Sequence, residues 1–483
     1  MRPFDLLQQQ AERAAARVAI RHKSHALDYR ALLNRVNHAS QQLSELGVTK
    51  GDRVALYLQK NIDLVVYLLA ANALGAVFVP INPLLKIPQL NHILRDTQAK
   101  LLVTHSQRVD INEADIGLVF LVDTQSIKQK TYDQSSLTSP DDLSCLLYTS
   151  GSTGLPKGVM LSDRNLIAGA EAVTEYLNNT SDDVLLSVLP LSFDYGLNQL
   201  ISSLLVGAEL VLFDYLLPCD IIKAIDTYKV TGVAGVPPIW QQLTRCDWTE
   251  SAQQHLRFIT NSGGHLAEPV QQILQKALPS TDIILMYGLT EAFRSTYLPA
   301  DLRHAHPDSM GVAIPGASLR VIDAQGHDCA DDQAGELIHA GDTVALGYWN
   351  HTDLTKQRFG SDNDGVRYVR SGDTVKRSAD GLFTFIGRDD EMMKVSGYRI
   401  SPQEIELPAL VLKGIEQAVC FNAGENIILL YQGNVSTDEL KQHLAHELPN
   451  YMQPSFIEQH PSLPLSANGK LDRALAKAQY PLR

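Results

Sequence analysis

One stretch of eleven residues decides the fold of this chain: Tyr148-Thr149-Ser150-Gly151-Ser152-Thr153-Gly154-Leu155-Pro156-Lys157-Gly158. It holds three glycines, four serine or threonine residues and one lysine. Glycine lets the backbone approach a ligand closely, while hydroxyl groups, backbone amides and lysine bind anionic oxygens. The stretch follows an apolar run at 143–147 that is typical of a strand, and it precedes a helical pattern that begins near Asp163. The pattern therefore predicts a loop that binds a polyphosphate.

This loop is not the P-loop of nucleoside triphosphatases, which requires Gly-Lys followed by Ser or Thr, because the chain offers Pro156 and Lys157 instead. It resembles the phosphate-binding signature of the AMP-forming adenylating enzymes and matches every fixed position of that signature. The superfamily contains acyl-CoA synthetases, adenylation domains of nonribosomal peptide synthesis, and luciferases. The resemblance implies that the ATP phosphates are bound by Thr149, Ser150, Gly151, Ser152, Thr153, Gly154 and Lys157.

Composition excludes several other classes of protein. A length of 483 residues suggests two to four domains or lobes, and a net charge of −13 argues against a nucleic-acid partner. The most apolar stretch, 64–81, is interrupted by Asn72, Gly75 and Pro80, so we expect no membrane segment. The five cysteines are scattered without a CxxC motif, which predicts a reduced cytoplasmic protein with neither disulfides nor a metal cluster.

At residues 1–23 a transit peptide is one interpretation, but Asp5 and Glu12 favour an ordinary first helix. From residue 53 onward, apolar strands alternate with amphipathic helices, which predicts an α/β fold of parallel sheets covered on both faces. The expected strands lie at 53–58, 77–81, 100–105, 184–189, 209–213, 232–237, 257–260 and 283–287, and the expected helices at 62–74, 89–96, 164–177 and 196–205.

The polar stretch 125–142 is expected to be a surface excursion. Beyond about residue 316 the runs become short and turn-bounded, which predicts an antiparallel or barrel-like subdomain. A small α+β block follows, with strands at 418–421 and 427–431 and a helix at 437–448. We therefore expect a large N-terminal adenylating domain at 1–389 and a short mobile C-terminal domain at 390–483.

Further motifs of the same superfamily follow in its order. Met286-Tyr287-Gly288-Leu289-Thr290-Glu291 ends a strand-like run, where α/β sheets bind ligands. The resemblance implies that Tyr287 stacks on adenine, Thr290 contacts the α-phosphate, and Glu291 holds Mg²⁺. In Asn261-Ser262-Gly263-Gly264-His265, the glycines allow adenine and substrate to lie against the backbone. Gly263, Gly264 and His265 are accordingly assigned to the nucleotide.

The remaining motifs lie toward the C-terminus. By resemblance, Asp373 binds both ribose hydroxyls as a double acceptor and Arg388 assists, while Asp390 is the hinge of the C-terminal domain. Lys470 is expected to bridge the substrate carboxylate and the α-phosphate during adenylation. Lys394 and Gly397 would face the active site only after the domain turns, lining the path for a thiol.

The resemblance runs from about Asp5 to Arg473 and has two departures. Residues 420–433 are compact and lack the longer segment with a Gly-Glu pair that is usual there, which bears on how the thiol acceptor is engaged. Ser162-Asp163 replaces the frequent Thr/Ser-His after the phosphate loop.

The identity of the acid depends on Phe193-Asp194, a pair found in amino-acid adenylation domains, where the aspartate binds the α-ammonium of the substrate. A buried carboxylate needs a partner, and either a substrate ammonium or Arg294 can supply it. Arg294 can alternatively recognise a polar substrate tail. The residues expected to line the pocket, a mixture too polar for a long alkyl chain, are Phe193, Asp194, Tyr195, Asn198, Ile239, Thr260, Ser262, Met286, Arg294 and Ser295.

These patterns also resemble free-standing ligases, such as prolyl-carrier-protein ligases and acyl ligases of exosortase loci. The predicted activity is ATP- and Mg²⁺-dependent adenylation of a small carboxylic acid, with an amino acid favoured and proline as a candidate. The acyl group would pass to phosphopantetheine on a carrier protein in trans. The alternatives are a CoA ligase for a short or hydroxylated acid, and a nucleotide-binding homologue without catalysis.

Overall fold

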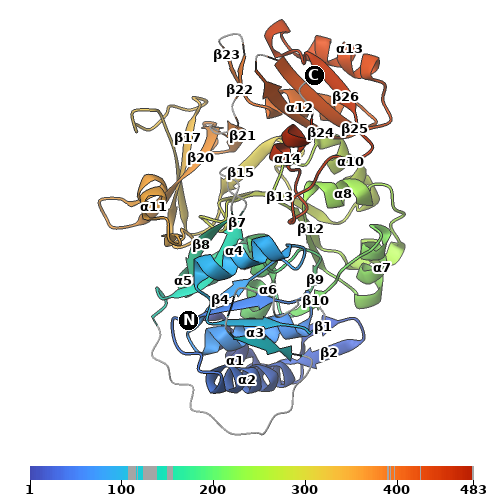
Figure 1. Cartoon of the computed structure of the whole chain (residues 1–483). Helices are drawn as coiled ribbons and strands as arrows, with labels where there is room; N and C mark the ends of the chain where they lie inside the picture. The colour runs from blue at the N-terminus through green and yellow to red at the C-terminus, as the bar shows by residue number, and fades with distance from the viewer. Residues whose placement is uncertain are drawn as a thin grey trace.

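The computed structural model describes residues 1–106, 116, 118–122, 139–149, 156–388, 391, 393–395, 398–424 and 426–480. Within this part of the chain, two large sheets are surrounded by helices, and a smaller three-stranded sheet lies near the C-terminus (Figure 1). The predicted α/β fold is confirmed.

The larger sheet has fourteen strands and passes from parallel to antiparallel pairing without a break. Its parallel part runs from β1 through β10, β9, β11 and β12 to β13, and antiparallel pairing begins between β13 and β14. The strands in spatial order are β16 (Ala317–Ile322), β17 (Gly335–Gly341), β20 (Arg367–Arg377), β21 (Phe383–Arg388), β15 (Ser309–Ala313), β14 (Thr296–Leu298), β13 (Asp282–Tyr287), β12 (Phe258–Asn261), β11 (Gly232–Gly235), β9 (Val184–Ser187), β10 (Glu209–Leu212), β1 (Val18–His22) and β2 (His25–Asp28), with β19 (Phe359–Ser361) beside β20.

The second sheet has seven strands and carries the segments on either side of the predicted phosphate loop. Its spatial order is β18 (Gly347–Tyr348), β8 (Lys157–Ser162), β7 (Leu143–Thr149), β4 (Val77–Pro80), β3 (Arg53–Tyr57), β5 (Leu101–Thr104) and β6 (Val119–Leu121). The strands from β7 to β6 are parallel, whereas β8 returns antiparallel to β7.

Helix α3 (Ile62–Ala73) is buried at almost every position because it contacts β1 of the larger sheet and β3 and β4 of the second. Asn72 interrupts its apolar sequence because it is a buried connector: its side-chain amide donates to Asp163 (2.8 Å) and Ser144 (3.0 Å). The other helices are α1 (Pro3–Arg13), α2 (Tyr29–Glu45), α4 (Ile87–Thr97), α5 (Asp163–Tyr176), α6 (Asp194–Val206), α7 (Cys219–Tyr228), α8 (Pro237–Leu243), α9 (Glu250–His255), α10 (Glu268–Ala277) and α11 (Thr352–Arg358).

The C-terminal part of the chain lies over the region of the larger sheet that contains β13, β14 and β15 (Figure 1). A cluster of buried side chains separate from the main core fills it, including Ile405, Leu429 and Leu440. The predicted domain boundary at 389/390 falls outside the described residues. The elements of this part are β22 (Met393–Val395), β23 (Tyr398–Ile400), α12 (Gln403–Val411), β24 (Ile415–Ala423), β25 (Asn426–Gly433), α13 (Thr437–Glu447), β26 (Phe456–Gln459) and α14 (Arg473–Gln479).

The expected strands and helices are present, with ends shifted by a few residues. The segment 1–23 differs from its predicted helix: only Pro3–Arg13 is helical, and Val18–His22 forms β1. Strand β8 was also not foreseen between the loop and α5. No described helix has the length and apolarity needed to cross a membrane.

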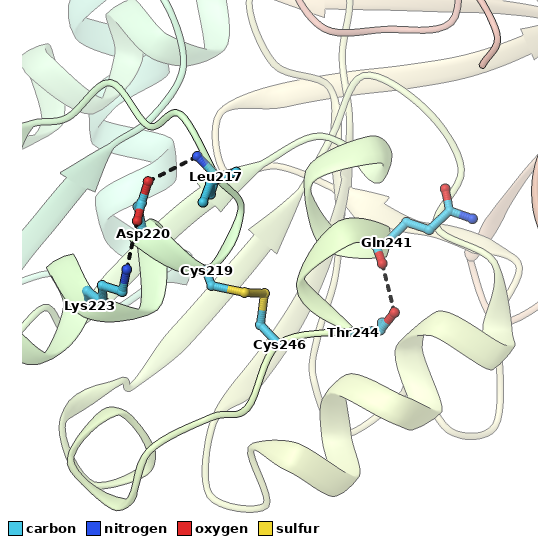
Figure 2. The surroundings of a disulfide bond; sticks show 7 residues. All are labelled: Leu217, Cys219, Asp220, Lys223, Gln241, Thr244 and Cys246. Atoms are coloured by element: carbon cyan, nitrogen blue, oxygen red, sulfur yellow. Dashed lines mark hydrogen bonds and ion pairs between the residues drawn. A yellow bond between two sulfur atoms is a disulfide. The ribbon is translucent and has the colours of Figure 1, made fainter. Parts of the chain in front are cut away.

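Cys219 and Cys246 form a disulfide bond, with Cα atoms 5.6 Å apart (Figure 2). The prediction that all five cysteines are reduced is wrong for this pair. Cys219 begins α7 and Cys246 follows α8, 27 residues later in the chain. The chain passes through β11 between the two cysteines, and the tertiary fold brings the start of α7 beside the end of α8. This contact could not be predicted from the spacing of the cysteines in the sequence.

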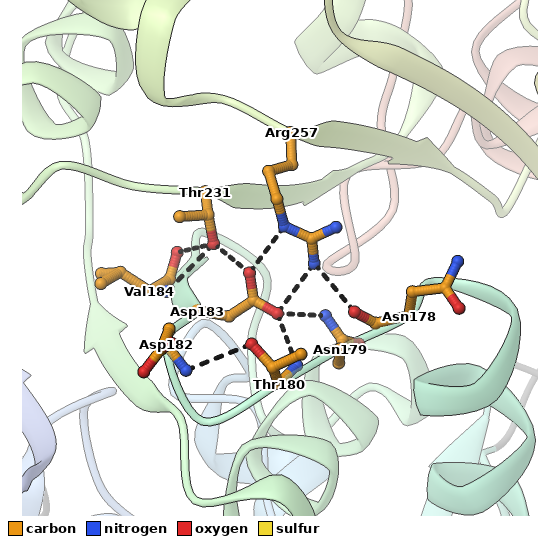
Figure 3. Close-up of polar contacts among 8 residues, drawn as sticks. All are labelled: Asn178, Asn179, Thr180, Asp182, Asp183, Val184, Thr231 and Arg257. Carbon is orange, nitrogen blue, oxygen red and sulfur yellow. Dashed lines mark hydrogen bonds and ion pairs between the residues drawn. The ribbon is translucent and has the colours of Figure 1, made fainter.

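A buried carboxylate joins the amino-terminal ends of three neighbouring parallel strands. Asp183 precedes β9 and is 2% exposed. It accepts hydrogen bonds from the guanidinium of Arg257 before β12 (2.9 and 2.8 Å) and from the hydroxyl of Thr231 before β11 (2.7 Å) (Figure 3). Burial alone would raise the pKa of Asp183, but its hydrogen bonds, that from Arg257 foremost, together lower this pKa below its ordinary value.

We expect Asp183→Ala to lower the free energy of unfolding at pH 7 by on the order of 3 kcal/mol, because it removes the acceptor of four hydrogen-bonding partners. An acid with a lowered folded-state pKa contributes stability above its unfolded-state pKa, and this contribution disappears as the pH falls through the folded-state value. The difference from the parent in urea melts should therefore shrink below pH 3.8. The control is Asp182→Ala, whose side chain is 85% exposed. Equal losses for both variants would contradict the assignment.

Candidate functional site

The predicted phosphate loop connects two antiparallel strands, with Thr149 opposite Lys157 in the register. Ser150, Gly151, Ser152, Thr153 and Gly154 lie outside the described residues. The ammonium of Lys157 lies 5.8 Å from the centre of the Tyr348 ring. The Lys157 end of the loop therefore lies at the edge where β18 adds to the second sheet.

The turn after β13 places one carboxylate next to that edge. The hydroxyl of Tyr348 donates to Glu291 (2.6 Å), and Thr290 precedes Glu291 at a half-buried position. No group of three or more metal-ligating acids, histidines or cysteines occurs among the described residues. A single carboxylate suits Mg²⁺, which commonly binds one or two carboxylates together with substrate phosphates and water.

Tyr287, at the end of β13, donates a hydrogen bond from its hydroxyl to Asp373 of β20. The other carboxylate oxygen of Asp373, Oδ1, has no hydrogen-bond partner among the described residues and lies 3.5 Å from Arg388 of β21. Burial raises the pKa of Asp373 to about 6, although the charge of Arg388 opposes that shift. The predicted ribose acceptor therefore has one oxygen bonded to tyrosine and one oxygen available.

The loop after β12 brings the paired glycines against another part of the chain. Gly263 has a φ of +80°, and a methyl group added there would lie 2.6 Å from Cε of Lys470. Any side chain larger than glycine would thus displace the lysine. The carbonyl of Gly264 accepts from the side-chain amide of Asn261 (2.9 Å), and Nε2 of His265 lies 3.5 Å from Asp308.

Lys470 reaches this position from a tight hairpin of the C-terminal part. The Ser466 backbone amide donates to the Lys470 carbonyl (2.7 Å), and Gly469 occupies the turn with a φ of +76°. The carbonyl of Ala467 at the tip accepts from the side-chain amide of Asn82 (2.9 Å). A second contact between the C-terminal part and the rest is the ion pair of Glu416 with Arg245.

The ammonium of Lys470 lies 4.7 Å from the centre of the Phe193 ring. Burial lowers the pKa of Lys470, and the negative charge of Asp194 opposes this effect. Among the predicted acid-binding residues, Phe193 therefore lies against the ammonium of Lys470, and Asp194 acts on it through its charge.

Asp194 and Arg294 form a buried ion pair, with Oδ2 and Nη1 3.8 Å apart and side chains 5% and 2% exposed. Burial raises the pKa of Asp194 despite the charges of Arg294 and Lys470. Of the two partners that the sequence allowed for Asp194, Arg294 is the one present in this structure. The remaining oxygen of Asp194 accepts from the backbone amide of Tyr195 (2.8 Å).

A small cavity of about 30 Å³ opens beside this pair. Of the residues expected to line the acid pocket, those that do line the cavity are Tyr195, Asn198, Thr260, Met286 and Arg294. Phe193, Asp194, Ile239, Ser262 and Ser295 do not contribute to its lining.

Sequence reasoning missed three polar lining residues, Asn179, Gln199 and Ser202. It also missed five apolar ones, which are Val173, Leu177, Leu185, Ala234 and Phe258. One signal was present: Asn198 and Ser202 are four positions apart on the buried helix α6, so they share one of its faces.

Three further predicted residues cannot be placed in the site. Asp390 and Gly397 lie outside the described residues. Lys394 is in the middle of β22, where only the strand is described.

Comparison with known proteins gives concordant results. A family model described as AMP-binding enzyme matches residues 7–349. Tyrocidine synthase 3 from Brevibacillus parabrevis is 30% identical over 492 residues, which cover 98% of this chain and 8% of that protein. The chain spans only 8% to 11% of the length of the first curated relatives that it matches.

Two solved structures share the fold. The anthranilate CoA ligase AuaEII in complex with anthranoyl-AMP has a TM-score of 0.89 at 24% identity, covering 99% of this chain and 97% of that one. The o-succinylbenzoate CoA synthetase MenE from Bacillus subtilis, in complex with ATP and magnesium, has a TM-score of 0.87 at 24% identity, covering 98% and 99%.

The raised pKa of Asp373 predicts that its ionised form destabilises the protein without ligand. The stabilising contribution of such an acid is present below its unfolded-state pKa of 3.8 and is lost as the pH rises through about 6. We expect Asp373→Asn to raise the free energy of unfolding at pH 8 by up to about 3 kcal/mol, measured by urea denaturation without nucleotide. The gain should vanish near pH 4.

The matched control for this measurement is Asp364→Asn on an exposed turn, which should change stability little at either pH. A loss of stability in Asp373→Asn at pH 8 would show that the ion pair with Arg388 outweighs the burial of the carboxylate.

Proposed function

Since the chain belongs to the AMP-binding enzyme family, we propose that it is an ATP-dependent, AMP-forming ligase that joins a small carboxylic acid to a thiol. The observation that carries this proposal is the position of Lys470, whose ammonium lies against Phe193 and whose stem lies against Gly263. One lysine there is within reach of both an acid in the pocket and a nucleotide bound along the ends of β12 and β13.

The adenosine of ATP would lie against Tyr287, with its ribose at Asp373 and Arg388. The free Oδ1 of Asp373 is a buried acceptor that needs a donor, and a ribose hydroxyl provides one. Gly263, Gly264 and His265 would form the facing wall, where the absence of side chains at the glycines allows a flat ring to approach the backbone.

The triphosphate would extend from Thr290 toward Thr149 and Lys157, and by the family resemblance residues 150–154 would supply further donors. Glu291 would hold Mg²⁺, which neutralises phosphate charge when it is bound. Tyr348 orients this carboxylate, because its hydroxyl donates to one of the Glu291 oxygens.

In the first half-reaction, an oxygen of the substrate carboxylate attacks the α-phosphorus, and the bond from that phosphorus to the bridging oxygen of pyrophosphate breaks. Lys470 stands between the two anions and reduces their repulsion, an effect worth roughly 3 kcal/mol in the transition state. In the second, a thiolate attacks the acyl carbon, and AMP leaves with the bonding electrons.

The thiol is proposed to be phosphopantetheine on a carrier protein supplied in trans, with CoA as the alternative. Asp390 would act as the hinge of a mobile domain at 390–483, and Lys394 and Gly397 would line the thiol path after the turn. The contacts of Ala467 with Asn82 and of Glu416 with Arg245 are those that such a movement must break.

An amino acid remains the favoured substrate, with proline as one candidate. Curated relatives include synthases of tyrocidine and gramicidin S that align along almost the whole chain. The charge of Lys470 acts on the pKa of Asp194, so an α-ammonium beside a carboxylate bound at Lys470 would lie near Asp194. The second candidate is a ligase for an acid without an amino group, because Arg294 already pairs with Asp194.

Lys470→Ala should reduce ATP–pyrophosphate exchange by about 10²–10³-fold while leaving nucleotide binding measurable. The matched control is Lys441→Ala on the exposed face of α13, which should retain full exchange. Unchanged exchange in Lys470→Ala would leave only the interpretation as a nucleotide-binding protein without this catalysis.

The amino group can be tested by measuring exchange with amino acids, proline among them, and with their des-amino analogues. Faster exchange with the amino acids supports an ammonium contact at Asp194, whereas equal rates for the two sets would refute it. Release of ADP instead of AMP during turnover would overturn the ligase itself.

A further inference from the structure

The cavity beside the Asp194–Arg294 pair contains hydrogen-bond donors that the protein leaves unused. Nε and Nη2 of Arg294 and Nδ2 of Asn198 are all buried, and none has a hydrogen-bond partner among the described residues. Both residues line the cavity. A buried donor without a partner costs about 1–3 kcal/mol, and more when it is charged. A ligand that offers acceptors to these donors would remove this cost, so such a ligand should bind more tightly than one without acceptors.

The backbone holds the guanidinium of Arg294 in place. Phe293 has a φ of +59°, a left-handed conformation that is uncommon for a bulky residue. Its ring occupies space that Gly169 of α5 leaves free, since a methyl group at Gly169 would lie 2.3 Å from that ring. This turn directs Arg294 inward, where its guanidinium lies 4.7 Å from the centre of the Tyr195 ring.

The protein satisfies only part of this guanidinium. Nη1 donates to the carbonyl of Phe293 (2.7 Å) and is the atom nearest Asp194. The edge formed by Nε and Nη2 is the one that binds carboxylates in a bidentate manner. Within the described residues, the lining has one acceptor without a donor, Oε1 of Gln199, so donors outnumber acceptors.

We propose that the acid activated by this protein carries a terminal carboxyl or carboxamide group on its tail, and that this group accepts hydrogen bonds from Arg294 and Asn198. The inference rests on the proposed ligase function and names the substrate class of the same pocket. The tail would extend from the carboxylate held at Lys470 past Tyr195, with its far oxygen at the Nε and Nη2 edge. Leu177, Leu185 and Phe258 make the remaining wall apolar, so the acceptor at the end of the tail is the group that the pocket can recognise.

The test measures ATP–pyrophosphate exchange by the full chain with two matched pairs of acids. Aspartate and leucine have tails of similar shape but differ in the acceptor, and succinate and 4-methylpentanoate are their des-amino counterparts. Asparagine separates a carboxamide from a carboxylate, and glutamate lengthens the tail by one methylene. We expect at least one acceptor-bearing acid to exceed its apolar counterpart by about 10²-fold or more in kcat/KM, because a polar site rejects analogues that leave it unpaired.

Two variants assign the effect to the named donors. Arg294→Met should remove most of the preference by lowering exchange with the acceptor-bearing acid while sparing that with leucine. Because this change also leaves Asp194 unpaired, Asn198→Leu provides a second measurement within α6 and should reduce the preference without touching the ion pair. Lys223→Ala, whose side chain is 74% exposed on α7, should leave the preference unchanged.

The outcomes separate this inference from the function on which it rests. If exchange depends on Lys470 but leucine or 4-methylpentanoate is equal to or better than every acceptor-bearing acid, the inference is overturned and the ligase stands. The ligase itself is overturned if no acid supports Lys470-dependent exchange although ATP binds. A uniform loss for all acids in both pocket variants would show a structural role for the two side chains and would also overturn the inference.

Discussion

The arrangement of this site depends on three ionisable side chains that share one poorly hydrated space. Asp194 begins α6, Arg294 follows β13, and Lys470 arrives on a hairpin of the C-terminal part. Two positive charges and one negative charge in such a space are costly unless further negative charge arrives. An anionic ligand would balance the excess positive charge of these three side chains.

The same principle applies at the nucleotide end. Asp373 is buried with one oxygen bonded to Tyr287 and the other without a hydrogen bond among the described residues. The hydrogen-bond network around Asp183 lies at the amino-terminal ends of the parallel strands. There, the carboxylate is paired with groups of the protein itself. Asp183 therefore has a structural role, whereas Asp373 keeps one oxygen that a ligand could use.

Much of the fold could be predicted from the sequence, because apolar runs and helical periodicity are local properties. The strands that end near Asn261 and Tyr287 were located in this way, and so were the motifs that follow them. The pairing of Cys219 with Cys246 could not be predicted, since it depends on a crossover. Gln199 and Leu185 were missed as cavity residues because nothing local distinguishes a core position from one beside an empty volume. The ion pair of Asp194 with Arg294 was one of two alternatives, because the placement of Arg294 depends on tertiary packing and not on a local pattern.

Gly169 has a consequence that reaches beyond its own helix. It touches no proposed ligand, yet the space that it leaves empty houses the Phe293 ring, and through that ring it sets the direction of the neighbouring guanidinium. A residue outside the cavity therefore influences the orientation of a side chain that lines it. Enlarging position 169 together with trimming position 293 would change the space that holds this ring, and with it the direction of the Arg294 guanidinium.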